Sequence, residues 1–166
     1  MNGGIRRTAN ATATGPTWTP LTDNLSSQSI GALEFDPTDP TYQTLVAGSG
    51  RLSSYGAIGP ARIGVLRTTD GGNTWSVLGT STFVNEKMMS IAALGTVILA
   101  ASDRQWGGVF GSGVFRSTSQ GACFPLVPGS AGLADGLVTY MEGSQGSEAR
   151  LFPGVRKVCF LHRRCH

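Results

Sequence analysis

Short apolar stretches separated by turn residues run along most of the chain. Stretches such as "TLVAGS" from Thr44 and "TVILAA" from Thr96 are almost continuously apolar, which is typical of strands covered on both faces. Gly, Pro, Asp and Asn gather between these stretches, and no long amphipathic helix is visible. The pattern therefore predicts an all-β chain of short strands joined by many turns.

Several of these stretches occur twice, in the same order. The paired segments are "SIGAL" from Ser29 and "SIAAL" from Ser90, "TLVAGSG" from Thr44 and "VILAASD" from Val97, and "GVLRTTDGGNTW" from Gly64 and "GVFRSTSQGACF" from Gly113. The spacings between the partners are 61, 53 and 49 residues. A period of this size with several short strands in each unit indicates propeller blades or an array.

Each unit divides into four expected strands. In the first complete unit they cover 28–36, 43–49, 62–69 and 73–79, and in the second 88–94, 96–102, 112–118 and 122–127. A hairpin from an earlier unit (3–21) precedes these two blades (28–79 and 88–127), and the start of a later unit (136–153) follows them. The expected fold is a partial β-propeller of four-stranded antiparallel blades over 1–153, followed by an atypical basic tail at 154–166.

The stretch from Thr68 to Trp75 carries a family resemblance. Its residues "TTDGGNTW" resemble the Asp box, S/T-x-D-x-G-x-T-W, of the bacterial neuraminidase repeat families. These families include sialidases, xyloglucan-cleaving glycosidases, sortilin-type receptors and photosystem assembly factors. The later copy keeps Ser117 and Gly121 but has Ser119 and Phe124 at the Asp and Trp positions; the earlier copy has Thr8, Asn10, Thr17 and Trp18. The resemblance implies a β-propeller.

Asp70 of this box is either a turn residue or a catalytic acid. A carboxylate and a hydroxyl can accept hydrogen bonds from the N–H groups of a tight hairpin, glycine tolerates positive φ, and tryptophan fills apolar space. Because every residue type in the motif has a turn role, we expect a structural function for it. The residues concerned are Thr68, Asp70, Gly72, Thr74 and Trp75, with Ser117, Gly121 and Phe124 in the later copy.

In the families that this chain resembles, ligand-binding residues come from loops at the end of the blade opposite the Asp boxes. The first such loop, 48–62, contains Arg51, Tyr55 and Arg62 as ligand-binding candidates. The second, 102–113, offers Asp103 together with Arg104, Gln105 and Trp106. Those four residues are either a sugar-binding platform or a solvated turn with Trp106 against the blade edge.

Two functional interpretations follow, and a third concerns assembly. The first is a non-catalytic propeller module that serves as a scaffold or as a carbohydrate- or protein-binding surface. The second is a fragment of a xyloglucanase- or sialidase-like glycoside hydrolase, in which Asp103 and Asp23 are the candidate loop carboxylates and Glu86 a weaker one. In the third, copies of the chain associate to complete a ring.

Charge and composition exclude several other classes of function. The formal charge is +3, but four of the 13 Lys and Arg residues lie in the terminal stretch, so we expect no nucleic-acid partner. Cys159, His162, Cys165 and His166 have metal-ligand side chains, yet an appended tail explains them better than zinc, and we expect no metal or cofactor. No apolar run is long enough for a membrane span, and the first fifteen residues contain none that could serve as a signal-peptide core, although the resembling families are often secreted or periplasmic.

Overall fold

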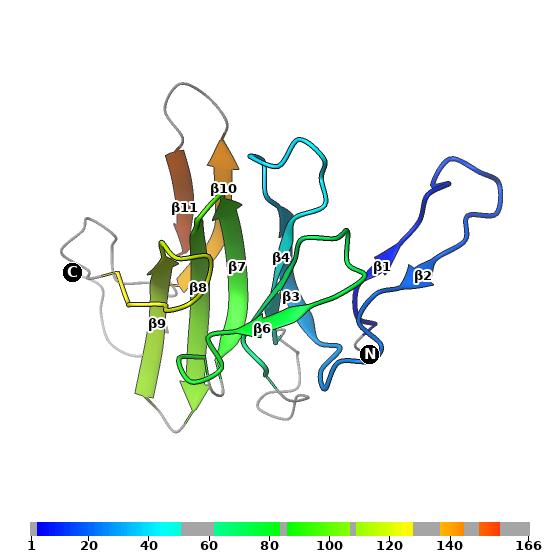
Figure 1. Ribbon diagram of the computed structural model, residues 1–166. Coiled ribbons are helices and arrows are strands. Elements are labelled where there is room, and N and C mark those ends of the chain that lie inside the picture. The colour runs from blue at the N-terminus through cyan, green and yellow to red at the C-terminus, as the bar shows by residue number, and fades with distance from the viewer. Residues whose placement is uncertain are drawn as a thin grey trace.

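The computed structural model describes residues 3–50, 62–83, 86–106, 109–127, 137–144 and 150–156. For 103–106, 109–112, 137–144 and 150–156 it describes the backbone only. All regular elements in these ranges are β-strands, so the all-β prediction is confirmed. The strands form several antiparallel sheets, none of which closes within the described residues (Figure 1).

The first complete sheet is a four-stranded meander. It comprises β3 (Ile30–Phe35), β4 (Leu45–Ser49), β5 (Val65–Thr68) and β6 (Ser76–Leu78), which pair in the order β3-β4-β5-β6. These are the four strands expected at 28–36, 43–49, 62–69 and 73–79, each somewhat shorter than expected. Asp39 closes the β3–β4 connection, because its carboxylate accepts hydrogen bonds from the backbone N–H groups of Thr41, Gln43 and Thr44 at 2.9, 3.1 and 2.8 Å.

The second sheet contains β7 (Lys87–Leu94), β8 (Val97–Trp106) and β9 (Val109–Ser117) in that order. The fourth strand, expected at 122–127, is reduced to a single bridge between Phe115 and Leu126. The backbone still follows β9 at that point, since the Val127 N–H group donates to the Val114 carbonyl oxygen at 2.7 Å. The second unit is therefore a three-stranded sheet with a short fourth segment along its edge.

Two-stranded sheets lie before and after these two. The first pairs β1 (Arg6–Arg7) with β2 (Thr19–Pro20), and the last pairs β10 (Leu137–Ser144) with β11 (Arg150–Arg156). Figure 1 shows β3 and β4 between the β1–β2 pair and β7, and β10 contacts β7, β8 and β9. The four sheets thus follow one another in the order of the sequence.

An apolar core joins the two larger sheets. Val46 and Val65 of the first sheet pack with Ile91 and Ile98 of the second, and all four are buried. The sheets approach closely at Gly48, where a Cβ atom would collide with the Met88 side chain. This glycine permits the close approach of the two backbones, which is a usual role for glycine inside a strand.

The opposite faces of both sheets are also covered. Ala47 and Leu66 of the first sheet pack with Ile5, which precedes β1, and with Leu21, which follows β2. On the second sheet, a separate cluster of Ala92, Leu99, Ala101 and Val114 occupies the far face. Because alternate residues of β4 and β8 enter different clusters, both strands require the nearly continuous apolar stretches seen in the sequence.

A buried carboxylate also connects the two larger sheets. Asp36 follows β3, and its two carboxylate oxygens accept the Gly95 N–H group at 3.1 and 3.0 Å. Gly95 lies in the short turn between β7 and β8 with φ of 61°. The same carboxylate accepts the N–H group and the hydroxyl of Thr38 at 2.9 and 2.8 Å. Asp36 therefore ties together the corresponding turns of consecutive sheets.

Within the residues that the structure describes, no helix is long and apolar enough to cross a membrane.

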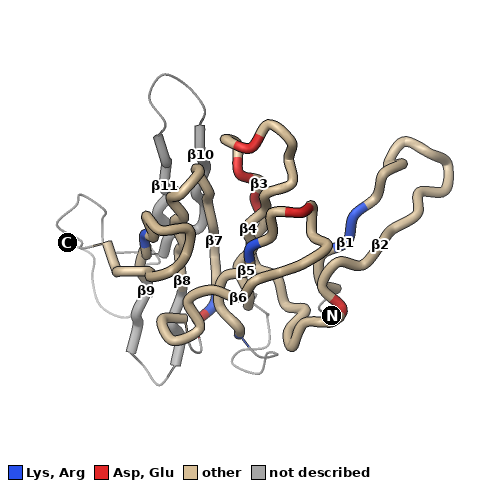
Figure 2. Tube along the Cα trace, viewed as in Figure 1, with Lys and Arg blue, Asp and Glu red and all other residues tan. Residues whose placement is uncertain are grey.

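Acidic positions gather in the β3–β4 and β5–β6 connections, at the same end of the first sheet, whereas basic positions lie on separate elements (Figure 2).

Candidate functional site

In the turn between β5 and β6, both carboxylate oxygens of Asp70 accept hydrogen bonds. One oxygen accepts the Thr68 hydroxyl at 2.7 Å and the Thr74 N–H group at 2.9 Å, and the other accepts the Thr74 hydroxyl at 2.6 Å. The Thr74 hydroxyl, the Thr74 N–H group and then the Thr68 hydroxyl favour the charged form, which holds the pKa of Asp70 well below its usual range. A carboxylate held in this way is a poor proton donor near neutral pH.

The rest of the motif completes the same turn. The Thr68 hydroxyl oxygen accepts the Gly72 N–H group at 3.0 Å and the Asp70 N–H group at 3.3 Å. Gly71 and Gly72 have φ angles of 69° and 90°, which only glycine adopts at little cost. The Trp75 indole N–H group donates to the Gly72 carbonyl oxygen at 3.1 Å, and its ring packs on the cluster of Ile5, Ala47 and Leu66.

The turn after β9 repeats this arrangement without the carboxylate. The Ser117 hydroxyl oxygen accepts the N–H groups of Ser119 and Gly121 at 3.2 and 2.9 Å. Gln120 and Gly121 have φ angles of 55° and 95°, close to those of the two glycines in the Asp70 turn. The Ser119 hydroxyl lies 3.4 Å from the Ser117 hydroxyl and 3.8 Å from the Cys123 sulfur.

The turn between β1 and β2 uses an amide in place of the carboxylate. The Asn10 side-chain oxygen accepts the Thr8 hydroxyl at 2.8 Å and the Thr17 N–H group at 3.0 Å. The Thr8 hydroxyl oxygen accepts the Asn10 N–H group at 3.2 Å. All three turns therefore have a hydroxyl that accepts at least one backbone N–H group, and in two of them an acidic or amide oxygen joins the two arms of the hairpin.

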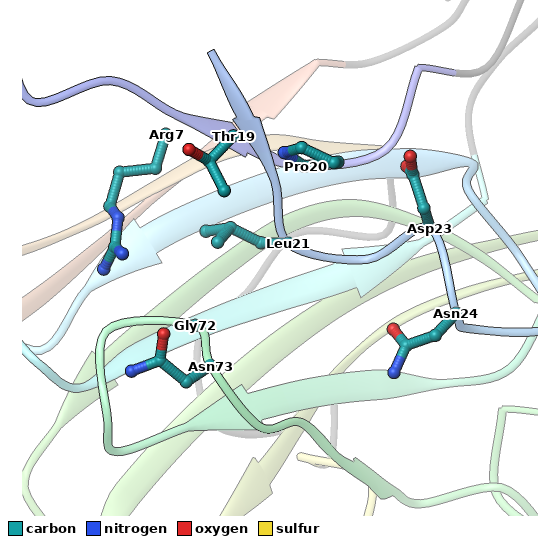
Figure 3. Close-up of a pocket in the computed structure, with 8 residues that line it drawn as sticks. All are labelled: Arg7, Thr19, Pro20, Leu21, Asp23, Asn24, Gly72 and Asn73. Carbon is teal, nitrogen blue, oxygen red and sulfur yellow. The ribbon is translucent and has the colours of Figure 1, made fainter. Parts of the chain in front are cut away.

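A surface pocket lies between the first hairpin and the Asp70 turn (Figure 3). It has a volume of about 330 Å³, and it is lined by Arg7, Thr19, Pro20, Leu21, Asp23, Asn24, Gly72 and Asn73. The Arg7 guanidinium fixes the two walls relative to each other by donating to the Gly71 carbonyl oxygen at 2.9 Å. The Asn73 side-chain amide donates to the Asp70 carbonyl oxygen at 2.7 Å.

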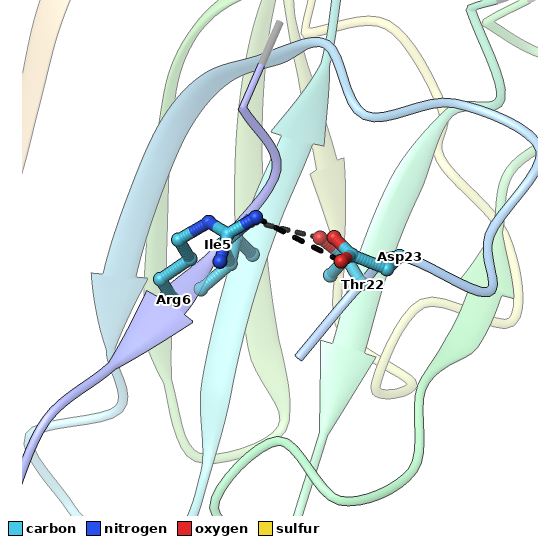
Figure 4. Close-up of polar contacts among 4 residues, drawn as sticks. All are labelled: Ile5, Arg6, Thr22 and Asp23. Carbon is cyan, nitrogen blue, oxygen red and sulfur yellow. Dashed lines mark hydrogen bonds and ion pairs between the residues drawn. The ribbon is translucent and has the colours of Figure 1, made fainter. Parts of the chain in front are cut away.

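Asp23 is held at one end of this pocket. Its carboxylate lies 3.8 Å from the Arg6 guanidinium, and both side chains are about half exposed (Figure 4). The neighbouring Thr22 is buried and accepts the Ile5 N–H group at 2.8 Å, which anchors this part of the chain to the start of β1. Asp23 is therefore a solvent-facing charge on a fixed backbone.

The other predicted ligand residues are distributed differently. Arg51 and Tyr55 lie outside the described residues, and the half-buried Arg62 begins the next described segment. Glu86 is only 3% exposed and accepts a hydrogen bond from the Ser102 hydroxyl. A ligand at the surface has no access to a carboxylate buried in this way.

The prediction of a loop over 102–113 is wrong. Asp103, Arg104, Gln105 and Trp106 belong to β8 and pair with residues of β9, as far as Trp106 opposite Val109. Only residues 107 and 108, a Gly-Gly pair, connect the two strands. A Gly-Gly pair between two strands is a sequence signal for a two-residue hairpin. The pairing of β8 with β9 therefore extends through 103–106 up to this pair, where a long loop was expected.

Pocket residues such as Arg7, Asn24 and Asn73 were not expected from the sequence as a ligand site. The two walls of the pocket come from hairpins far apart in the chain, and the Arg7–Gly71 hydrogen bond spans 64 residues. No local motif marks such a pocket. In the part of the chain that the structure describes, no group of three or more His, Cys, Asp or Glu side chains could hold a metal ion. The tail with Cys159, His162, Cys165 and His166 lies outside that part.

Comparison with known proteins adds no assignment. No protein-family model matches the sequence, and no curated protein matches it either.

Proposed function

We propose that this chain is a run of β-propeller blades of the Asp-box type that acts as a non-catalytic scaffold for carbohydrate binding. Two features support the blade arrangement. A four-stranded antiparallel meander stacks on the sheet that follows it, and the hairpin turns repeat one pattern of hydrogen bonds. Strands that are apolar on both faces are what such stacking requires.

The observation that carries the non-catalytic assignment is the state of Asp70. Both of its oxygens accept hydrogen bonds from Thr68 and Thr74 within its own turn. The equivalent turns place Asn10 and Ser119 at this position, and neither an amide nor a hydroxyl can replace a carboxylic acid as proton donor. The motif thus serves the hairpin and leaves ligand binding to neighbouring residues.

The pocket beside this turn is suited to a ligand rich in hydroxyl groups. Arg7, Asn24 and Asn73 present hydrogen-bond donors, and Asp23 and the two asparagines present acceptors. Pro20 and Leu21 add apolar surface to the lining of the same pocket. Sugars present hydroxyl groups around apolar C–H faces, so a lining that contains both polar and apolar side chains favours a saccharide.

Isothermal titration calorimetry with a panel of neutral and acidic oligosaccharides tests this proposal. We expect the wild-type chain to bind at least one of them and Asn24→Ala to weaken that binding about fivefold, the value of one lost hydrogen bond. Thr118→Ala is the matched control, because Thr118 is an exposed polar residue far from the pocket in the chain. We expect it to bind as the wild type does.

An assay with aryl glycosides tests the non-catalytic part. We expect no turnover above the rate without protein. Hydrolysis that disappears in Asp23→Ala or Asp103→Ala would overturn the assignment and make the chain part of a glycoside hydrolase.

The calorimetric titration has its own contradicting outcome. If no saccharide in the panel bound, or if Asn24→Ala bound every saccharide as the wild type does, the pocket would not be the binding site.

A further inference from the structure

One face of the first sheet is covered only in part. Leu33 and Phe35 of β3 are 46% and 48% exposed, and the exposed ring of Tyr42 packs edge-on against Phe35 with the ring centroids 6.1 Å apart. We call this surface the open face. Ala47 and Leu66 lie next to the open face on the same side of the sheet, and they are fully buried because Ile5 and Leu21 pack on them.

The second sheet shows how the same positions are normally covered. The pairs Ala47–Leu66 and Ala100–Phe115 are equivalent, since the repeats align β4 with β8 and β5 with β9. Leu33 pairs with Ala47, and Ile91 pairs with Ala100, so Leu33 corresponds to Ile91. Phe35 corresponds to Ala93 by the same register.

The corresponding residues differ sharply in exposure. Ile91 and Ala93 are 2% and 1% exposed, because β3 and β4 of the preceding sheet lie against β7. In the described residues, only β1, β2 and their flanking residues lie before the first sheet, and these cover Ala47 and Leu66 but not the open face. The missing cover therefore has the form of an inner strand pair like β3–β4.

The chain contains such a pair in β10–β11. Its strand β10 contacts the second sheet, as β7 contacts the first. Within the described ranges, β10 and β11 pair only with each other, and β1 and β2 also pair only with each other. By position in the repeat, β10 and β11 are the first two strands of a unit and β1 and β2 are the last two.

We infer that the β10–β11 hairpin of a second copy of this chain covers the open face and pairs its β11 with β1, which completes a four-stranded sheet. This inference rests on the blade arrangement proposed above. It also accounts for the exposed apolar side chains of Leu33 and Phe35, whose burial favours association. The same pairing removes the free edge that β1 would otherwise present.

The geometry also limits the size of the assembly. The contact is head-to-tail, because the hairpin of one copy meets the open face of another, and contacts of this kind close into a ring or extend into a fibre. Each copy would contribute two complete sheets and one half of each of two composite sheets. A ring of two copies would hold about six sheets, within the range of about four to eight blades, whereas three copies would exceed it. The expected assembly is a dimer.

Sedimentation velocity over a wide range of concentrations tests the inference with the full chain. We expect a reversible monomer–dimer equilibrium in which Leu33→Lys raises the dissociation constant about tenfold or more, since it places a charge in the contact. Val77→Lys is the matched control. Val77 lies opposite Leu66 on the same side of the sheet and is 40% exposed, but it belongs to the outer strand β6. We expect it to dimerise as the wild type does.

Hydrogen exchange distinguishes the head-to-tail contact from a face-to-face one. On dimer formation we expect protection of amides in both 30–36 and 150–156, whereas two open faces in contact would protect only the former. A wild-type chain that stays monomeric at all concentrations, or a dimer insensitive to Leu33→Lys, would overturn the inference. Retained saccharide binding by such a monomer would leave the proposed function standing, so the two failures are distinguishable.

Discussion

At the scale of single residues, the role of Asp70 follows from the groups that donate hydrogen bonds to its carboxylate oxygens. Thr68 and Thr74 bind both carboxylate oxygens at distances between 2.6 and 2.9 Å. These bonds join the end of β5 to the residues that lead into β6. The carboxylate therefore contributes to the folded state by closing a hairpin, and its removal is expected to affect stability before it affects binding.

Substitution of Asp70 tests this role. We expect Asp70→Ala to lower the melting temperature, because the Thr74 N–H group and two hydroxyls lose their acceptor. Asp70→Asn is the control and should have a milder effect, since Asn10 accepts equivalent bonds in the first hairpin. Thermal unfolding followed by circular dichroism measures both. An alanine variant that melts with the wild type would contradict the turn role.

The pH dependence of stability follows from two depressed pKa values. Hydrogen bonds from the Thr41 hydroxyl and N–H group, together with bonds from Thr44, lower the pKa of Asp39, as those from Thr74 and Thr68 lower that of Asp70. Their contribution is fully present above the ordinary carboxyl pKa of 3.8 and is lost as the pH falls from there towards the folded-state values. Both side chains face solvent, so salt reduces the effect.

Urea unfolding across this pH range measures the effect. We expect the unfolding midpoint of the wild type to fall more steeply in acid than that of the double variant Asp39→Asn/Asp70→Asn. Parallel curves for the two proteins would show that neither carboxylate stabilises the fold through its charge.

The chemistry of the Asp70 turn was predictable at this scale, whereas the pocket was not. Thr, Asp and Gly at fixed spacing have turn functions that depend only on their neighbours in the chain. Arg7 and Asn73 acquire their shared position only when two hairpins pack together. A single sequence contains no local sign of such a contact.

At the scale of elements, the turn after β3 connects to the turn after β7 through Asp36. We expect Asp36→Ala to lower the free energy of unfolding by about 2 kcal/mol, because the Gly95 and Thr38 donors lose a buried, charged acceptor. Asp36→Asn keeps one acceptor and should cost less. Chemical denaturation measures both variants, and an alanine variant as stable as the wild type would show that this contact does not hold the sheets together.

The turn after β9 can be changed so that stability is expected to rise. Ser119 and Cys123 occupy the positions of Asp70 and Thr74. We expect the pair Ser119→Asp/Cys123→Thr to raise the free energy of unfolding by about 1 kcal/mol, as a cross-hairpin hydrogen bond is gained. Thr118→Asp adds the same charge one position away and serves as the control. A double variant no more stable than this control would mean that the three turns are not equivalent.

The existence of most strands was predictable, and their register was not. Apolar stretches located β3 to β5 and β7 to β9, but the match of "SIGAL" with "SIAAL" aligns Ile30 with Ile91, whereas pairing aligns Leu33 with Ile91. Bulges interrupt both ladders at equivalent places, between Ile30 and Ala32 and between Met88 and Ser90, so they do not cause this difference. A five-residue match of small and apolar residues does not fix the register of a strand, because similar residues recur along it.

At the scale of the whole molecule, consecutive sheets stack so that each buries a face of the next. Two apolar clusters flank the first sheet, and two flank the second. The repeat in the sequence predicted these units, because a unit that cannot bury both faces alone requires neighbours. The same packing creates the pocket, since Arg7 of one hairpin meets Gly72 and Asn73 of the next unit. The stacking of the sheets and the pocket are thus consequences of one arrangement.

We propose that this chain binds a saccharide between β1–β2 and the Asp70 turn without cleaving it. A nuclear magnetic resonance titration of the isotope-labelled chain with the saccharide panel measures both parts in one sample. We predict that a bound saccharide shifts the signals of Arg7, Asn24 and Asn73 while the saccharide's own spectrum shows no cleavage product. Signals of these residues that remain unchanged throughout the panel, or the appearance of a hydrolysis product, would contradict the claim.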